Sequence, residues 1–226
     1  MTLKKSLRDL ISLNTMDEGM TEKQISILLS AIELFSENGY EATSTSEIAK
    51  KAKVAEGTIF RYYKTKKDLL FDIPSSLSKS SLFEVFLEDF NELWNDNHKN
   101  FEDFLRKLIL NRKTFISETM PILKVIIQEI PFHSELRNKI LDTVIFPTVN
   151  KFLKLVDKFK EQGEIIDIPS ISIVKLIGTS IFGYFFLNYI AMPSIYRNND
   201  DLDFLVQYIM NGICPNNTVT NNIIQV

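Results

Sequence analysis

Residues 43–70 constrain the fold of this chain most strongly, because they combine two short amphipathic helices with a tight turn. Ser44 is a favourable N-cap, and Glu47 three positions later can complete a capping box, so a helix is predicted to start here. Its narrow apolar stripe leaves room for another helix to cross closely. Residues 53–55 form the predicted turn and residues 56–62 the second short helix, which together make a helix-turn-helix.

The charge of this stretch points to a polyanionic partner. The chain as a whole has a formal net charge of −3, which alone would not suggest nucleic acid. Between positions 50 and 67, however, Glu56 is the one acid among seven basic residues. These are Lys50, Lys51, Lys53, Arg61, Lys64, Lys66 and Lys67. A helix-turn-helix that carries such a cluster is what the phosphate backbone of a DNA duplex attracts.

A family resemblance follows from the same residues. The pairs and runs Ile48-Ala49, Val54 to Tyr63 and Lys66 to Leu69 resemble the DNA-binding domain of TetR/AcrR-type transcriptional regulators, over residues 21–70. The resemblance implies an N-terminal DNA-binding domain, dimerisation through the last two helices, and release from DNA when a ligand binds. The rest of the chain agrees with that family in length and helical character only.

Nine residues are predicted to contact DNA. Gly57 allows close approach of the backbone to base edges, whereas Glu56, Thr58 and Arg61 are candidates for base contacts. The resemblance places phosphate contacts at positions that match Thr45, Tyr62 and Lys66, and Lys64 can reach the backbone as a mobile cation. The full set is Thr45, Glu56, Gly57, Thr58, Phe60, Arg61, Tyr62, Lys64 and Lys66.

Four residues depart from the pattern of the family. Phe60 stands where Tyr is common and lacks a hydroxyl for phosphate. Lys53 replaces the usual turn Gly, which costs stability if its φ is positive. Ala55 is a poor N-cap where Ser is common. Glu56 repels phosphates unless its carboxylate finds a cytosine amine. These departures bear on the operator sequence rather than on DNA binding itself.

Beyond the helix-turn-helix the sequence predicts helices throughout, so the fold class is all-α. The chain holds only seven Gly and seven Pro among 226 residues, and no stretch shows the alternation of a hairpin. The predicted parts are an N-terminal extension (1–20), a three-helix DNA-binding domain (21–70), a larger helical ligand-binding and dimerisation domain (71–213) and a flexible tail (214–226). The extension is either a frayed arm or an arm that contacts DNA through Lys4, Lys5 and Arg8.

Prolines are predicted to interrupt several helices. Pro74 should break or bend a helix that begins near residue 66. Pro121 should open a short helix. Pro147 should bend a long helix over residues 135–162.

The segment 171–192 is apolar and long enough to cross a bilayer, but Lys175, Ser180 and Asn188 interrupt it. We therefore expect a helix shared between the core and a subunit interface, and no membrane partner. A homodimer is predicted, because one helix-turn-helix makes too few contacts for a specific operator. The predicted interface residues are Phe182, Phe185, Leu202, Leu205 and Ile209.

The many Phe residues of the C-terminal part have two interpretations. They are either ordinary core residues, or the lining of an apolar pocket in which a small molecule shifts the spacing of the two DNA-binding heads. If the Phe residues line a pocket, its effector is expected to be an apolar or amphipathic small molecule. The predicted ligand-binding residues are Phe86, Phe90, Phe104, Leu108, Arg112, Phe115 and Ile181.

Enzymatic interpretations find little support. His98 and His133 have no partners at metal-ligand spacing, Cys214 has no evident activating base, and neither a phosphate-binding Gly loop nor a serine-nucleophile motif occurs. We expect no metal, no cofactor and no catalysis. A single cysteine and the absence of a signal-peptide pattern predict a cytoplasmic location. The main alternative to a repressor is a helical lipid-binding or protein-interaction module that has lost specific DNA binding.

Overall fold

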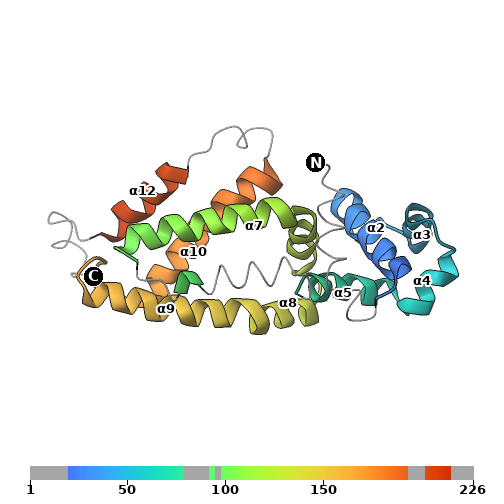
Figure 1. Ribbon diagram of the computed structural model, residues 1–226, viewed down its shortest axis with the longest axis horizontal. Helices are drawn as coiled ribbons and strands as arrows, with labels where there is room; N and C mark the ends of the chain where they lie inside the picture. Colours follow the sequence, from blue (N-terminus) through green and yellow to red (C-terminus); the bar gives the residue numbers. More distant parts are fainter. Residues whose placement is uncertain (1–19, 79–91, 95–97, 193–201, 215–226) are drawn as a thin grey trace. The chain divides into compact units, whose positions relative to one another are not determined.

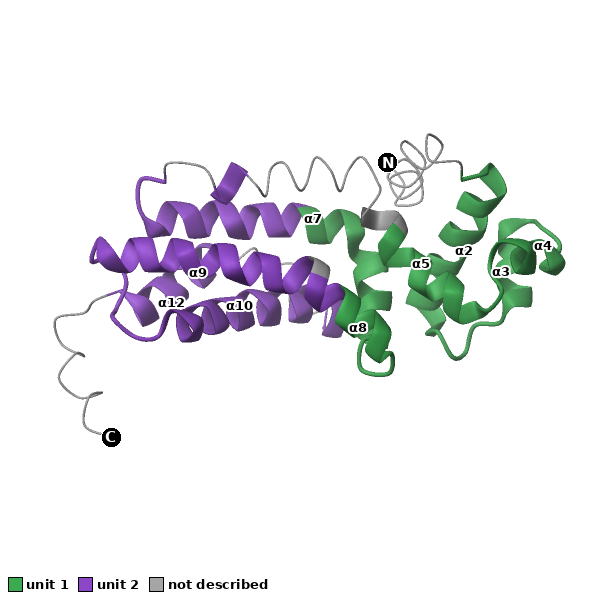
Figure 2. Ribbon diagram, turned by 90° about the horizontal axis from the view of Figure 1, so that it is seen from below, with its two compact units in different colours: residues 1–89, 115–139 green, residues 90–114, 140–226 purple. Residues whose placement is uncertain are grey.

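The computed structural model describes residues 20–78, 92–94, 98–192 and 202–214, and every regular element in these ranges is a helix (Figure 1). The predicted all-α class is therefore confirmed for the described part of the chain. Two compact units divide the chain: residues 1–89 with 115–139 (unit 1), and residues 90–114 with 140–226 (unit 2; Figure 2). The expected boundaries at residues 20, 70 and 213 stay predictions, as do the two roles considered for Lys4, Lys5 and Arg8, which lie outside the described residues.

Helix α2 (Glu22–Asn38) supports the helix-turn-helix. Thr21 caps it: its hydroxyl accepts from the Gln24 backbone N–H at 3.3 Å, while the Gln24 side chain accepts from the Thr21 N–H at 3.0 Å. Gly39 ends the helix with a φ of 87°, a backbone conformation that residues with a Cβ rarely adopt. One face of α2 is fully buried, so this helix supplies much of the hydrophobic core of unit 1.

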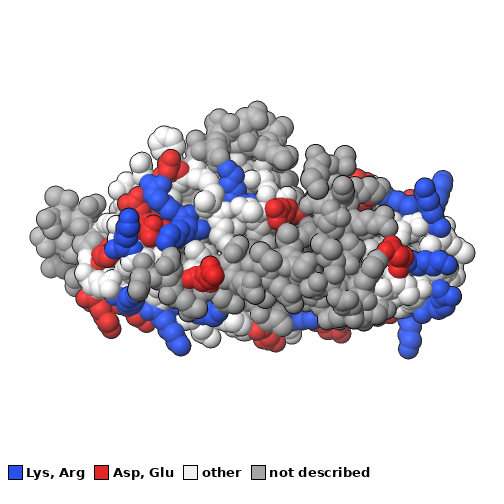
Figure 3. All heavy atoms as spheres, in the orientation of Figure 1, with Lys and Arg blue, Asp and Glu red and all other residues white. Residues whose placement is uncertain are grey.

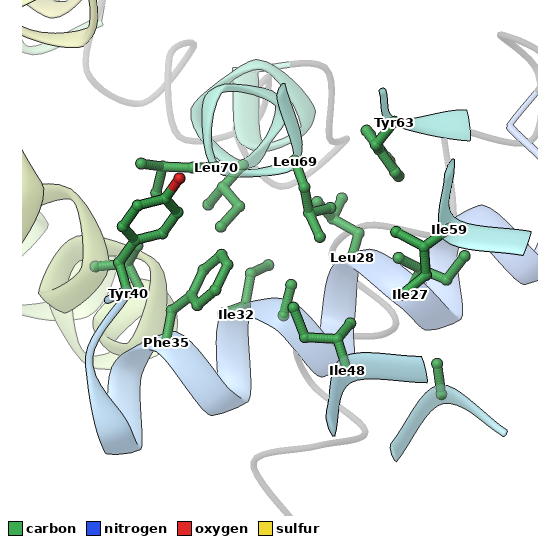
Figure 4. Close-up of a cluster of buried hydrophobic side chains, with 14 of the residues drawn as sticks. Ile27, Leu28, Ile32, Phe35, Tyr40, Ile48, Ile59, Tyr63, Leu69 and Leu70 are labelled. Carbon is green, nitrogen blue, oxygen red and sulfur yellow. The ribbon is translucent and has the colours of Figure 1, made fainter. Parts of the chain in front are cut away.

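Helices α3 (Thr45–Ala52), α4 (Glu56–Tyr62) and α5 (Lys66–Ser78) pack on α2 around one cluster of apolar side chains (Figure 4). Ile48 from α3, Ile59 from α4 and Leu69 from α5 are almost completely buried in it. Ile122 and Val125 join the cluster from a later helix, α7 (Phe101–Glu129). Burying such side chains stabilises the fold by about 1.5–3 kcal/mol each, which holds two very short helices in place.

The prediction for Pro121 is wrong, because this residue lies inside the 29-residue helix α7 instead of opening a new helix. Helix α5 continues past Pro74 to Ser78, so Pro74 does not break it, and a bend there stays a prediction. A proline within a helix costs about 3 kcal/mol, because it removes a hydrogen bond and crowds the preceding turn. Ile122 and Val125 are buried in the turn that starts at Pro121, and their packing offsets that cost. The sequence around the proline does not reveal this packing.

Unit 2 is built on residues 101–114 of α7 together with α9 (Phe146–Glu161), α10 (Ser170–Phe186) and α12 (Leu202–Ile213). The single helix expected over residues 135–162 is instead α8 (Ser134–Ile140), a π-helical turn η1 (Leu141–Ile145) and α9. Pro147 is the second residue of α9, two positions after the end of the π turn, and its missing N–H accounts for the irregularity. A second π turn, η2 (Leu187–Ala191), extends α10.

Candidate nucleic-acid interface

Helix α3 is ordered by its own sequence. The Ser44 hydroxyl accepts from the Glu47 backbone N–H at 3.2 Å, and Glu47 Oε2 accepts from the Ser44 N–H at 2.8 Å, as predicted. The Ser44 hydroxyl also lies 2.8 Å from the same Oε2, and the hydrogen bonds that the Glu47 carboxylate accepts from the Ser44 backbone N–H and hydroxyl lower the pKa of Glu47. Lys53 ends the helix in the left-handed region with a φ of 57°, so the strain expected for a non-glycine residue in the turn is present.

Helix α4 lacks such local support. Its N-cap is Ala55, which makes no side-chain capping bond, and only Ile59 of its seven residues is buried. The side chains of Glu56, Phe60 and Arg61 are exposed. Gly57, the second residue of the helix, is exposed as well, and a Cβ added there would meet no atom within 4 Å. The first turn of α4 therefore presents open backbone to solvent, as a helix that approaches base edges requires.

Cations surround this surface. The side chains of Lys50, Lys53, Arg61 and Lys64 are exposed on or beside α3 and α4. In the face drawn in Figure 3, Lys and Arg gather at the right-hand end, where Figure 1 places α3 and α4. A concentration of positive charge around a helix-turn-helix attracts phosphates and gives salt-dependent binding.

Two of the predicted contact residues bind each other. The Thr45 hydroxyl donates to Glu56 Oε1 at 2.6 Å and so joins the first residue of α3 to the first residue of α4. Sequence spacing gave no sign of this bond, because the two residues lie 11 positions apart and meet only through the turn.

Tyr62 is anchored to α2. Its hydroxyl accepts from the Thr21 hydroxyl at 3.1 Å and from Arg61 Nη2 at 3.0 Å, and the Arg61 guanidinium lies 4.9 Å from the centre of its ring. The bond from Thr21 is the first cause of the lowered pKa of Tyr62. A phenolic hydroxyl both accepts and donates, so Tyr62 can donate to a phosphate oxygen while Arg61 donates to it. Thr21 was missed as a functional residue, because it lies 41 positions away from Tyr62.

Lys66 has a different position from the one that the resemblance implied. Its ammonium donates to the backbone carbonyl of Tyr40 at 2.8 Å and to that of Thr43 at 3.1 Å, and it lies 4.2 Å from the centre of the Tyr40 ring. It therefore fastens α5 to the loop between α2 and α3 instead of extending toward solvent. Lys64, by contrast, is exposed.

The predicted ligand-binding residues divide between the units. Phe104, Leu108 and Ile181 are buried in unit 2, and Phe104 contacts other aromatic rings at centroid distances of 5.1–5.8 Å. Arg112 also belongs to unit 2, and burial lowers its pKa. Phe115 belongs to unit 1 and packs against its hydrophobic core. The predicted lining residues Phe86 and Phe90 lie outside the described residues.

The predicted dimer residues of α10 and α12 lie partly on helix faces that pack inside the chain and partly on faces exposed to solvent. Phe185, Leu205 and Ile209 are at most 8% exposed and pack inside the chain, so they cannot supply an interface surface and the prediction is revised for them. Phe182 is 56% exposed, and Leu202 is half-buried. The large apolar side chains exposed on α10 and α12 are Ile171, Leu176, Phe182, Phe204 and Tyr208. Helical spacing shows that a helix has two apolar faces but does not say which of them the chain covers itself.

Comparison with known proteins identifies similar chains. Residues 27–73 match the family of bacterial regulatory proteins, tetR family. A fatty acid metabolism regulator protein of Bacillus subtilis is 45% identical over 51 residues, which cover 23% of this chain and 26% of that protein. The HTH-type transcriptional regulator YvkB of the same organism is 32% identical over 144 residues, which cover 61% of this chain and 66% of YvkB. The matches thus span less than two thirds of the length of these relatives.

Solved structures extend the similarity to most of the chain. PfmR, a TetR family transcriptional regulator from Thermus thermophilus, superposes with a TM-score of 0.62 at 17% identity and covers 84% of this chain and 95% of its own. The transcriptional regulator FadR from Bacillus subtilis in complex with stearoyl-CoA has a TM-score of 0.60 at 23% identity. This superposition covers 84% of this chain and 98% of FadR. At these identities the comparison shows a shared fold.

Proposed function

We propose that this chain, whose residues 27–73 match the tetR family of bacterial regulatory proteins, is a DNA-binding transcriptional regulator that responds to a small molecule. As a homodimer in the cytoplasm it binds a palindromic operator and represses transcription, and an apolar or amphipathic effector releases it. The observation that carries the proposal is the exposed first turn of α4, where Gly57 leaves the backbone open within a cationic surface.

DNA is the partner that this surface fits best. A helix that enters a major groove with its N-terminal turn needs small residues there, so that its backbone can come close to the bases. It also needs longer side chains beside them that donate or accept hydrogen bonds. Gly57 meets the first need, and Glu56 and Arg61 meet the second. Lys50 and Lys64 flank the same surface and supply mobile cations for phosphates. No catalytic step is assigned, and among the described residues no three His, Cys, Asp or Glu side chains gather as a metal site would require.

A substitution at Gly57 tests the assignment. Because a Cβ there meets nothing within 4 Å, Gly57→Gln should leave the fold intact and yet hold α4 away from the bases. We expect at least ~100-fold weaker binding to a duplex that the unaltered chain selects from random sequences, since specific binding exceeds non-specific binding by far more than this. Fluorescence anisotropy measures the affinity, and circular dichroism checks the fold.

Two further variants make this test quantitative. Gly57→Ala adds a single methyl group and should weaken binding less than Gly57→Gln does. Asn138→Gln enlarges an exposed side chain of α8 in the same unit and should change nothing. Unchanged affinity of Gly57→Gln would contradict the placement of α4 in the groove.

We place the dimer contact on the outward faces of α10 and α12. By length and composition, Ser170–Ala191 is the one described helix that could cross a membrane, yet only 28% of its most apolar window is buried within the chain. Phe182 and Phe186 stack at 5.7 Å between ring centres on this helix, and Phe204 and Tyr208 are 69% and 72% exposed on α12. A second copy that covers these side chains removes apolar surface from water and pairs two α4 helices.

Phe182→Glu is expected to convert the dimer to a monomer, because it places a charge within an apolar contact. Specific DNA affinity should fall by at least ~100-fold with it, since one helix-turn-helix loses the contacts of the second half-site. Analytical ultracentrifugation measures the oligomeric state. Leu110→Glu, at an exposed apolar residue of α7, is the matched control and should remain dimeric. A dimeric Phe182→Glu protein would exclude this face.

The effector is proposed to bind in unit 2. Phe104, Leu108 and Ile181 supply apolar surface there, and the half-buried Arg112 supplies a cation suited to an acidic head group. An acyl chain with an anionic end has this chemistry, and FadR is an example of a similar fold that holds stearoyl-CoA. Native mass spectrometry of the purified chain should detect a bound small molecule whose addition weakens DNA binding. A ligand that leaves DNA affinity unchanged would contradict its role as the effector.

A further inference from the structure

Thr45 and Glu56 form a closed pair at the front of the helix-turn-helix. The hydroxyl of Thr45 donates to Glu56 Oε1 at 2.6 Å, a short distance typical of a bond to an ionised carboxylate. Thr45 is the first residue of α3 and Glu56 the first residue of α4, and the Glu56 side chain is exposed. The bond therefore fixes an otherwise mobile carboxylate against α3.

This bond changes what the Thr45 side chain can do on DNA. A hydroxyl has a single proton to donate, and in Thr45 that proton points at Glu56. Phosphate oxygens only accept hydrogen bonds, so they cannot replace Glu56 without breaking the pair. The Thr45 backbone N–H lies in the first turn of α3, where amide groups lack partners within the helix, and it remains suited to a phosphate.

The fixed carboxylate has acceptor capacity left. A carboxylate offers about four acceptor positions and no donor, so the bond from Thr45 leaves Glu56 Oε2 available. In a major groove such a group pairs with an exposed amine, and the usual partner of Glu is the N4 amine of cytosine. Gly57 follows directly and lets the backbone come close to the same base. The exposed cations Lys53 and Arg61 offset the repulsion between the carboxylate and the phosphates.

On this geometry, and resting on the proposed function, we propose that Thr45 is a positioning residue that holds Glu56 for recognition of a cytosine in each half-site. Glu56 is then the specificity determinant, and Thr45 acts through it. Two consequences follow. Loss of the Thr45 hydroxyl should relax base preference at one position without removing a phosphate contact. Glu56→Gln should move the preference at that position from cytosine to adenine, because an amide both accepts and donates.

Selection of duplexes from a random library by the full chain tests the inference, with Thr45→Val, Thr45→Ser and Glu56→Gln compared with the unaltered protein. Val matches the shape of Thr without its hydroxyl, and we expect it to lower the preference for cytosine at one position per half-site roughly tenfold. Ser keeps a hydroxyl and should restore that preference. The slope of log affinity against log salt should stay the same for both variants, because no phosphate contact is lost.

A different pattern would overturn the inference. If Thr45→Val weakens all sequences equally and reduces the salt slope by about one, the hydroxyl is a phosphate contact instead. If Glu56→Gln leaves the selected sequence unchanged, Glu56 reads no base. If the unaltered chain selects no sequence at all, the proposed function fails together with the inference, whereas the first two results leave the proposed function standing. Thermal unfolding of each variant confirms that the fold is kept.

Discussion

Helices α3 and α4 are neighbours of nearly equal length, yet they are ordered in different ways. Helix α3 has a complete capping box between Ser44 and Glu47 and buries Ile48, Ala49 and Ala52. Helix α4 has an alanine cap and a glycine in its first turn, and it buries Ile59 alone. Most of what fixes α4 comes from elsewhere, through the bonds of Tyr62 to Thr21 and of Glu56 to Thr45.

The difference shows how a binding surface is made on a very short helix. Capping residues and apolar side chains stabilise a helix but fill the space that a ligand needs. In α4 the exposed positions hold residues suited to contact, and the stability comes from α2, α3 and the shared core. Helix α3 therefore carries the stabilising cap and buried side chains, while its neighbour α4 carries the exposed residues suited to contact.

The largest expected effect comes from removing the one buried side chain of α4. Ile59 is 1% exposed, and Ile59→Ala should lower the free energy of unfolding of unit 1 by about 2–5 kcal/mol. Phe60→Ala, next to it in the same helix but at a residue 48% exposed, should cost less than about 1 kcal/mol. Urea denaturation followed by circular dichroism measures both. Equal losses would show that α4 is not held by its single anchor.

Exchanging the caps should bring the two helices closer together in stability. Ser44→Ala is expected to cost about 1 kcal/mol, because the Glu47 N–H loses its acceptor. Ala55→Ser should add about 0.5–1 kcal/mol, since Ala55 already has the extended N-cap backbone with φ of −70° and ψ of 145°. The gain is limited because the Thr58 N–H already donates to the Ala55 carbonyl at 2.8 Å. A melting temperature that Ala55→Ser does not raise would show that α4 gains nothing from a local cap.

The smallest expected effect is a dependence on pH confined to α3. Hydrogen bonds from Ser44 hold the pKa of Glu47 below its ordinary value of 4.5. A carboxylate with a lowered pKa in the folded state stabilises the fold above its unfolded pKa, and this is lost as the pH falls through the folded pKa. The melting-temperature difference between the unaltered chain and Glu47→Gln should be largest near pH 7 and narrow below pH 4.5. A difference independent of pH would exclude the charge of Glu47 as its source.

Features set by neighbouring residues were predictable from the sequence. Both capping boxes, the positive φ of Gly39 and the missing cap at Ala55 follow from local chemistry, whereas the positive φ of Lys53 is indicated only by the resemblance, in which Gly is usual at that position. Contacts that depend on the fold were not predictable. Lys66 looked like a phosphate contact, because its basic character is local, whereas its carbonyl partners at Tyr40 and Thr43 lie more than 20 residues away.

The C-terminal part shows the same limit. Helical spacing identified apolar stripes on α10 and α12. The division into buried Phe185 and Leu205 and exposed Phe182 and Phe204, however, depends on which face of α10 meets α9 and which face of α12 meets α10. The passage of α7 through Pro121 likewise depends on buried Ile122 and Val125. Which face of a helix is buried, and whether a helix continues through a proline, are decided by packing between distant residues and not by the local sequence.

Hydroxyl-radical footprinting of the full chain on its selected duplex tests most directly whether two copies of α4 bind one DNA. We expect two equivalent protected half-sites related by two-fold symmetry, with centres about 34–36 Å or a multiple of that distance apart, and no protection with Gly57→Gln. A single asymmetric protected site, or equal protection by the Gly57→Gln protein, would contradict paired insertion of α4 into successive turns of the major groove.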